Sequence, residues 1–304
     1  MEEILLYSPS TSANVGPGYD IFAMALEKPH DEIKLTLNKT DSINIEIVGD
    51  NQNIPVSIMD NTAGLAVTEL LRRYNLKLGL DIKIFKKMTS GGGLGTTGAS
   101  SAAAIYGLNK LLNLNLSDNE MIDIARFGEV ASGGSPHADN VAASILGGFV
   151  LIKSYNPIDT LKLNLPGFPV VLSVIKKSQR TTRGFITYEI GQEKLKQQMA
   201  HCSRIISAIY TNDIQEFGKA ISVDHIAEPV RGASIPGYFE IKKAVLDAGA
   251  YGFTISGGGS SVIAICSEDN KAKIADLMHG LFATNPNYVE TIITKTSNQG
   301  VREI

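Results

Sequence analysis

One glycine-rich segment, residues 90–101, constrains this chain more than any other feature. It reads Ser-Gly-Gly-Gly-Leu-Gly-Thr-Thr-Gly-Ala-Ser-Ser, between a strand-like run at 80–87 and a helix-forming run at 99–112. A strand that turns through glycines into a helix presents bare backbone N–H groups and the positive end of the helix dipole. The segment therefore predicts a phosphate-binding loop, and the alternative is a glycine-rich structural turn.

Other phosphate-binding motifs fit the segment poorly. Gly93, Gly95 and Gly98 have the spacing of the dinucleotide fingerprint. That fingerprint needs an acidic residue at the end of a second strand about 20 positions on, and residues 116–120 read as a helix start instead. The chain also has no Gly-Lys-Ser/Thr of a Walker A loop and no Val-Ala-x-Lys strand of a protein kinase.

Composition excludes several classes of protein. The formal net charge is −3 over 304 residues without a Lys/Arg run, so we expect no nucleic-acid partner. Apolar runs are far shorter than the roughly 20 residues that a membrane span needs, and the acidic N-terminus lacks a signal-peptide pattern. We therefore expect a cytoplasmic protein without a membrane partner. Its two cysteines lie in no zinc-binding spacing.

Strands and helices are mixed along the chain in a way that favours α+β layers over a doubly wound parallel sheet. Periodicity predicts strands at 3–8, 31–37, 43–48, 80–87, 147–153, 170–175, 251–256, 261–266 and 289–295. It predicts helices at 62–74, 117–130, 193–211, 213–223, 237–248 and 270–283. A polar, proline-bearing stretch at 154–169 places a domain boundary, which divides the chain into residues 1–160 and 161–304.

Three segments resemble the motifs of the GHMP small-molecule kinases, and the N-terminal one resembles its homoserine kinase form. Residues 93–100 (Gly-Leu-Gly-Thr-Thr-Gly-Ala-Ser) resemble the central ATP-binding motif, with Thr at 89 in place of its proline and Gly98 in place of an alanine. Residues 10–20 (Ser-Thr-Ser-Ala-Asn-Val-Gly-Pro-Gly-Tyr-Asp) resemble the N-terminal motif. Residues 255–262 (Ile-Ser-Gly-Gly-Gly-Ser-Ser-Val) resemble the C-terminal glycine motif. The three lie in family order over nearly the whole chain.

The resemblance implies a two-domain α+β fold with the active cleft between the domains. The N-terminal domain would be ribosomal-protein-S5-like, and the C-terminal domain would be a ferredoxin-like α/β sandwich. ATP would be held by the loop, at Gly91, Gly92, Gly93, Leu94, Gly95, Thr96, Thr97, Gly98, Ser100 and Ser101. Asn61 resembles the adenine-side segment, and its alternative role is a helix N-cap.

The same resemblance implies a magnesium ion held by Thr97 and Glu129. Mg²⁺ prefers hard oxygen ligands, one or two of them from protein and the rest from phosphates and water. The alternative for Glu129 is a solvated carboxylate on a helix.

A polar cluster at 134–142 resembles the homoserine kinase segment His-x-Asp-Asn-Val-Ala, here carrying His137, Asp139 and Asn140. A simple turn is the alternative, because Pro, Asp and Asn favour turns. The resemblance implies that His137 and Asp139 bind the amino acid. Where other GHMP kinases place a catalytic Asp, this site offers Asn140, which would lie near the reacting hydroxyl. The resemblance therefore implies no strong general base, and catalysis would depend on in-line positioning and charge stabilisation.

Two arginines, Arg183 and Arg231, resemble those that bind the substrate carboxylate in homoserine kinases. A guanidinium group binds a carboxylate through two parallel hydrogen bonds. Each arginine alone favours a surface or ion-pair role. Asn14 and Asp20 are suited to an ammonium group, so the whole set favours a zwitterion instead. The family's threonine near the transferred phosphoryl corresponds to Gln179, which we include among the substrate residues.

The implied activity is phosphorylation of the L-homoserine hydroxyl by ATP, which gives O-phospho-L-homoserine for threonine biosynthesis. The alternatives are a GHMP kinase for another small alcohol, such as mevalonate or shikimate, and a catalytically silent nucleotide-binding protein. A homodimer is compatible with the resemblance.

Overall fold

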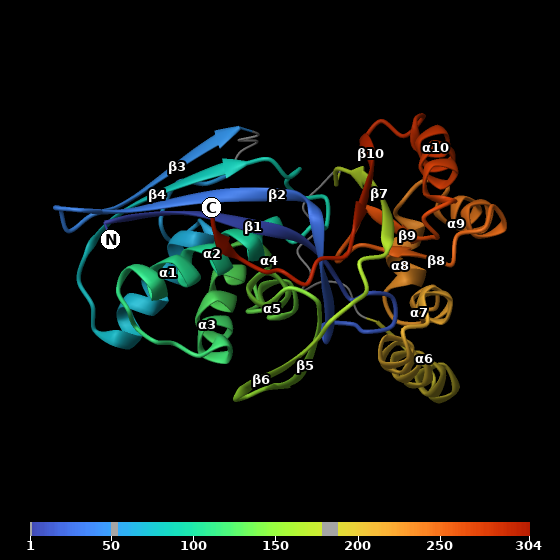
Figure 1. Cartoon of the computed structure of the whole chain (residues 1–304), viewed down its shortest axis with the longest axis horizontal. Coiled ribbons are helices and arrows are strands. Elements are labelled where there is room, and N and C mark those ends of the chain that lie inside the picture. The colour runs from blue at the N-terminus through green and yellow to red at the C-terminus, as the bar shows by residue number, and fades with distance from the viewer. Residues whose placement is uncertain (1, 50–53, 178–187) are drawn as a thin grey trace.

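The computed structural model describes residues 2–49, 54–177 and 188–304, and Figure 1 shows two sheets with their helices side by side. Within these residues no helix combines the length and the apolar character needed to span a bilayer. The two sheets with mixed helices confirm the predicted two-domain α+β fold over a doubly wound one.

The larger sheet has the strand order β11-β1-β2-β4-β3, with β5 paired to β2 and β6 paired to β5. Among the described strands of this sheet, neighbours run antiparallel except β3 and β4. Its strands are β1 (Glu3–Ala13), β2 (Phe22–Asn38), β3 (Ile43–Gly49), β4 (Gly79–Lys86), β5 (Phe149–Tyr155), β6 (Ile158–Leu163) and β11 (Arg302–Glu303).

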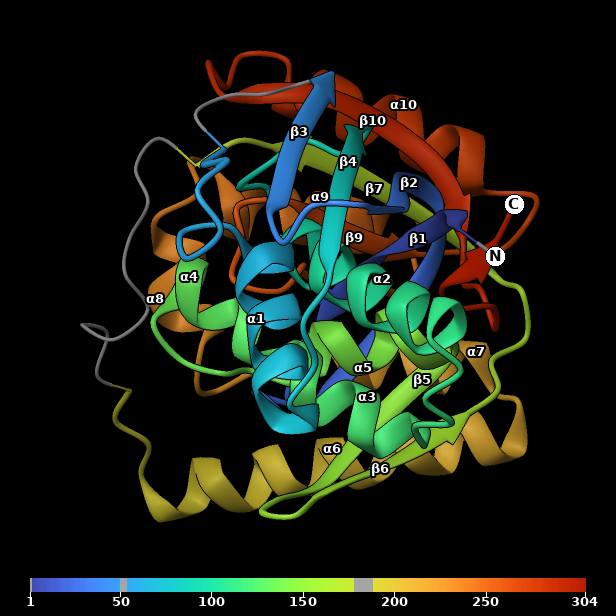
Figure 2. The same cartoon turned by 90° about the vertical axis from the view of Figure 1, so that its left-hand side faces the viewer.

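Helices cover one face of this sheet (Figures 1 and 2). They bury alanines and aliphatic side chains against alternating apolar residues of β1, β2 and β4. The helices are α1 (Thr62–Tyr74), α2 (Thr96–Leu111), α3 (Asp118–Ala125), the short α4 (Val130–Gly133) and α5 (Asp139–Leu146).

The smaller sheet has the order β10-β7-β9-β8, with antiparallel neighbours, and helices on both faces. Val170, Leu172 and Val174 of β7 pack in the core with α6 and α7, whereas Val171 and Ile175 pack in the core with α9 and α10. Its elements are β7 (Pro169–Ile175), α6 (Gln192–Thr211), α7 (Ile214–Ile221), α8 (Glu228–Ala233), α9 (Tyr238–Asp247), β8 (Gly252–Ile255), β9 (Val262–Ile265), α10 (Lys271–Phe282) and β10 (Tyr288–Lys295).

Several predicted boundaries differ from the structure. The helix predicted to run to 130 ends at Ala125 and tightens into a 3₁₀ turn, where a Cβ on Gly128 would lie 2.3 Å from the Thr62 carbonyl oxygen. The strand predicted at 147–153 begins at Phe149, because Gly147 and Gly148 adopt φ of 69° and 72°.

The predicted boundary between 160 and 161 falls inside β6, which pairs with β5 in the larger sheet. We propose the division after Leu163 instead, with the last strand, β11, returning to the first domain.

Candidate active site

The glycine loop leads directly into helix α2, as its sequence predicts. Gly95 is the N-cap, with φ of 65°, and it makes no side-chain capping bond. The first turn of α2 carries no acidic residue, whereas α3 is closed by a complete capping box between Ser117 and Glu120. The start of α2 is therefore not neutralised by a side-chain cap, which leaves the positive end of its dipole for an anionic ligand.

The three glycine motifs, far apart in sequence, meet in space. The N–H of Thr11 donates to the carbonyl of Leu94, at 3.0 Å. From the other side, the hydroxyl of Ser256 donates to the carbonyl of Gly93, at 2.8 Å. The glycine loop is thus held between strand β1 and the turn that joins β8 to β9.

Close packing explains why position 95 is a glycine. A Cβ there would lie 1.9 Å from Thr11 Oγ1 and 2.7 Å from Asn140 Oδ1. Those two atoms are themselves hydrogen-bonded, because the Thr11 hydroxyl donates to Asn140 Oδ1 at 2.8 Å. Gly95 therefore lets the loop lie directly against the side chain predicted to be near the reacting hydroxyl.

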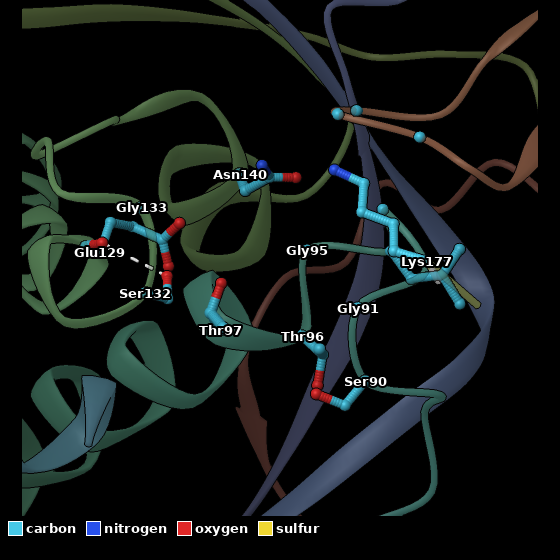
Figure 3. A pocket seen from close by; sticks show the side chains of 15 residues that line it. Ser90, Gly91, Gly95, Thr96, Thr97, Glu129, Ser132, Gly133, Asn140 and Lys177 are labelled. Atoms are coloured by element: carbon cyan, nitrogen blue, oxygen red, sulfur yellow. Dashed lines mark hydrogen bonds between the residues drawn. The ribbon is translucent and has the colours of Figure 1, made fainter. Parts of the chain in front are cut away.

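A cavity of about 320 Å³ opens over the loop (Figure 3). We call it the phosphate cavity. Of the predicted site residues, it brings together Gly91, Gly93, Leu94, Gly95, Thr96, Thr97, Glu129 and Asn140; its other lining residues are Ser90, Ser132, Gly133, Lys177, Gly257, Gly258 and Gly259.

Not every predicted phosphate ligand lines this cavity. Gly92 and Gly98 are buried behind the loop, and the Ser101 hydroxyl donates to the Gly98 carbonyl at 3.1 Å. The Ser100 hydroxyl donates to the Thr96 carbonyl at 3.0 Å. Both hydroxyls therefore donate to carbonyls within the first turns of α2.

A buried ion pair supports the loop from below. Lys86 Nζ lies 2.6 Å from Asp31 Oδ2, and their side chains are 4% and 0% exposed. The same ammonium donates to Thr96 Oγ1 at 2.6 Å and to Ser100 Oγ at 2.9 Å. The Thr96 hydroxyl in turn donates to Asp31, at 2.8 Å. Each polar group in this network is satisfied inside the fold, so the pair fixes the start of α2.

Sequence analysis missed this pair, although a signal was present. Leu80, Ile82 and Ile84 alternate along β4 on its buried face, and Lys86 is the next residue on that face. A charge on a buried face must be paired, because an isolated buried charge is very costly. Asp31 occupies the matching place on β2, before the buried Ile33 and Leu35.

Thr97 and Glu129 approach the phosphate cavity from different elements. Glu129 ends the 3₁₀ turn at 126–129 and is 4% exposed, so the expected alternative of a solvated carboxylate is wrong. Figure 3 shows the Thr97 side chain pointing into the space between the loop and the turn at 129–133. A hydroxyl and one carboxylate are hard oxygen donors and fit Mg²⁺. The described residues contain no group of three or more His, Cys, Asp or Glu side chains that could hold a metal ion.

The predicted ammonium-binding residues lie together beside this cavity. Asn14 Oδ1 accepts from the Asp20 N–H at 3.0 Å, and Asp20 Oδ1 lies 3.7 Å from His137 Nδ1. The Asn14 amide donates to the carbonyl of Gly257 at 2.9 Å. Gly257 lines the phosphate cavity, so this cluster adjoins the loop.

Arg231 converges on the same carbonyl from the second domain. Its Nη1 donates to Gly257 O at 2.8 Å, and its Nε donates to the Tyr188 hydroxyl at 3.1 Å. The guanidinium carbon lies 5.5 Å and 5.7 Å from the ring centres of Tyr19 and Tyr188. Arg231 is 8% exposed, so the alternative of a surface ion pair is wrong. Tyr19 lies in the N-terminal motif next to Asp20, whereas no local sequence pattern links Tyr188 to the site.

The helix that carries Arg231 is fastened to the first glycine turn. The Asp224 carboxylate accepts the N–H groups that open α8, at 2.8 to 3.1 Å. Gln198 of α6 donates both to Asp224, at 2.9 Å, and to the Pro17 carbonyl, at 2.8 Å. Gln198 therefore fixes the distance between the turn at 14–20 and Arg231.

Asp139 is buried rather than open to a ligand. It is 1% exposed, and its carboxylate accepts the N–H of Asn140 at 2.8 Å, so it orients the start of α5. It lines neither the phosphate cavity nor the small cavity beside Arg231. Burial raises the pKa of the Tyr155 phenol, and the carboxylates of Asp139 and Asp20 raise that pKa further.

Asn61 caps helix α1, which confirms the expected alternative. Its Oδ1 accepts from the N–H groups of Ala63 and Gly64, at 3.0 and 3.3 Å. Asn61 also lines a small cavity that shares Thr96 and Thr97 with the phosphate cavity, and an adenine contact there stays a prediction. Gln179 and Arg183 lie outside the described residues.

Comparisons with known proteins identify the family of this chain. The family model of the GHMP kinase N-terminal domain matches residues 61–148, and that of the C-terminal domain matches 205–281. The chain is 36% identical over 286 residues to the homoserine kinase of Methanococcus vannielii, covering 93% of this chain and 94% of the relative.

Solved structures give the same result. The crystal structure of homoserine kinase from Cytophaga hutchinsonii matches with a TM-score of 0.91 at 33% identity, over 100% of this chain and 98% of that one. The mevalonate kinase of L. major matches with a TM-score of 0.71 at 16% identity, over 99% and 97%, and shares the fold alone. This chain belongs to the GHMP kinase family, among the homoserine kinases.

Proposed function

We propose that this protein transfers the γ-phosphoryl group of ATP to the side-chain hydroxyl of L-homoserine. The product would be O-phospho-L-homoserine, an intermediate of threonine biosynthesis. One observation carries the proposal: Asn14 and Arg231, from different domains, converge on the carbonyl of Gly257 at the rim of the phosphate cavity. This arrangement supports an amino-acid site beside a phosphate site.

The nucleotide would lie with its triphosphate over the start of α2. Backbone N–H groups of the loop residues that line the phosphate cavity would bind the phosphate oxygens, assisted by the helix dipole. Thr97 and Glu129 would hold magnesium, which neutralises charge on the phosphates when bound. Asn61 would border the adenine side.

The amino acid would lie with its charges matched to both domains. Two of the five N–H donors of Arg231 are engaged by Gly257 and Tyr188, and the others suit a carboxylate. Arg183 is proposed as its partner. The carboxylate of Asp20, beside Asn14 and His137, suits the ammonium group. Asp139 would act through Asn140, whose N–H its carboxylate accepts.

The chemical step would be an in-line displacement. The homoserine hydroxyl oxygen forms a bond to the γ-phosphorus while the bond to the β–γ bridging oxygen breaks, and ADP leaves with the electron pair. Asn140 lies at the cavity with its Oδ1 accepting from Thr11, and an amide is no general base. The hydroxyl proton would therefore leave late, to a phosphate oxygen or water, as a loose transition state allows.

A substrate screen tests the proposal. Purified protein with ATP and Mg²⁺ is assayed for ADP release with L-homoserine, mevalonate or shikimate, and the product is identified by ³¹P NMR. We expect turnover with homoserine far above that with the other alcohols. Equal or faster turnover of mevalonate would refute the assignment. Tight nucleotide binding without turnover of any alcohol would instead favour a silent nucleotide-binding protein.

A further inference from the structure

One cation of the phosphate cavity has no role in the mechanism above. Lys177 follows the end of β7 in the second domain and lines the cavity across from Glu129. Among the described lining residues it is the only lysine or arginine. Figure 3 shows its side chain passing the loop at Gly91, with the ammonium group pointing toward Asn140.

The backbone holds Lys177 in a fixed place relative to the glycine loop. Ser261 links the two, because its hydroxyl accepts from the N–H of Ile175 at 3.0 Å and its own N–H donates to the Gly92 carbonyl at 3.1 Å. The N–H of Lys176 donates to the Asn287 carbonyl at 2.9 Å, which continues the β10–β7 pairing by one residue. The backbone that carries Lys177 is thus connected to the loop through two hydrogen bonds of Ser261 and a short piece of chain.

The charges of the cavity indicate what this cation does. ATP carries about four negative charges, magnesium offsets two, and Glu129 adds one. Lys86, the other lysine near the loop, is engaged with Asp31, Thr96 and Ser100 below it. Lys177 faces the cavity on the side of Asn140, where the substrate hydroxyl is expected. Negative charge on the transferring group and on the leaving oxygen is therefore within reach of Lys177.

We propose that Lys177 is a catalytic residue whose ammonium group binds the terminal phosphoryl group and stabilises its charge during transfer. The proposal rests on the kinase function proposed above. The reaction balance is unchanged, because Lys177 keeps its proton: it donates hydrogen bonds to phosphoryl oxygens while one P–O bond forms and another breaks. A donor aimed at developing charge commonly contributes about 100-fold to 1000-fold to the rate.

The test compares Lys177→Ala, Lys177→Met and Lys177→Arg with Lys176→Ala as the matched control. Lys176 is the adjacent lysine and does not line the cavity. We expect Lys177→Ala and Lys177→Met to lower kcat by about 100-fold or more, with Lys177→Arg retaining much of the rate. Lys176→Ala should stay within about threefold of the wild type, the range of a surface substitution. Added methylammonium should restore part of the Lys177→Ala rate.

Nucleotide binding separates this proposal from the proposed function. Losing Lys177 should weaken binding of the non-hydrolysable analogue AMP-PNP, measured by displacement of fluorescent mant-ADP, and leave ADP affinity nearly unchanged. If the wild type phosphorylates no homoserine, the proposed function fails, and the AMP-PNP comparison still decides the role of Lys177. If the wild type is active and folded Lys177→Met keeps both kcat and AMP-PNP affinity, the inference is overturned. Circular dichroism and the ADP affinity establish that each variant is folded.

Discussion

Removing the guanidinium of Arg231 should weaken homoserine binding without an equal effect on ATP. Arg231 is 8% exposed, and its bonds to Tyr188 and Gly257 hold the group in one orientation. A bidentate contact between buried charges contributes about 2–4 kcal/mol. At 1.4 kcal/mol for each factor of ten, Arg231→Ala should raise the KM for homoserine by about 30-fold to 700-fold.

The assay couples ADP release to NADH oxidation and varies one substrate at a time. L-Homoserinol, which has a CH₂OH group in place of the carboxylate, should be a poor substrate for the wild type and lose little more in Arg231→Ala. Arg204→Ala is the matched control, because Arg204 lies on α6 and pairs with Glu216 at the surface. Equal increases in KM for homoserine and ATP, or an equal loss with homoserinol, would refute the carboxylate role.

Further substitutions test other parts of the site. Glu129→Gln should raise the Mg²⁺ concentration needed for half-maximal rate, and an unchanged Mg²⁺ titration would count against that ligand. Gly95→Ala should lower kcat at least about 10-fold, because the added Cβ would break the hydrogen bond between Thr11 and Asn140. A wild-type kcat would contradict the close packing of position 95 against these two side chains. Lys86→Met or Asp31→Asn alone should lower the free energy of unfolding by about 3–5 kcal/mol in urea, and the double variant by less than the sum. Single variants with the wild-type free energy of unfolding would contradict the predicted cost of leaving one buried charge unpaired. Burial raises the pKa of both cysteine thiols to about 11, so they stay neutral in the folded protein while those of the unfolded chain ionise near 8.5. The contribution of the neutral thiols to the free energy of unfolding is thus present below about pH 8.5 and lost as the pH rises toward 11. At pH 8, the thiols of the native protein should react with a thiol reagent far more slowly than those of the unfolded protein.

Local rules explain what could be predicted from the sequence. The loop at 91–98 follows a strand and leads into a helix, as predicted. Its glycines allow the positive φ angles of the turn, and the helix begins without a side-chain cap. The capping box at Ser117 and Glu120 and the alternation of β4 were correct for the same reason. These features depend on residues a few positions apart, which a single sequence displays.

Contacts between distant segments explain what could not be predicted. The buried pairing of Lys86 with Asp31 joins two strands, and the enclosure of Arg231 by Tyr19 and Tyr188 joins three segments. Helix α5 was not predicted: its start was interpreted as a polar functional cluster, with a turn as the alternative. The helix packs on α2 and β1, which lie far from it in sequence. In each case the tertiary neighbour, rather than local propensity, decides the structure.

The short last strand has a consequence for biosynthesis. Strand β11 pairs with β1 at Leu6 and Tyr7, the N–H of Ile304 donates to the Leu5 carbonyl, and Figure 2 shows the two chain ends close together. During synthesis, β1 is made long before β11, the strand that covers its outer edge. A chain that lacks β11 would leave the backbone of β1 open to pairing with another chain, so the return of β11 protects this sheet edge from aggregation.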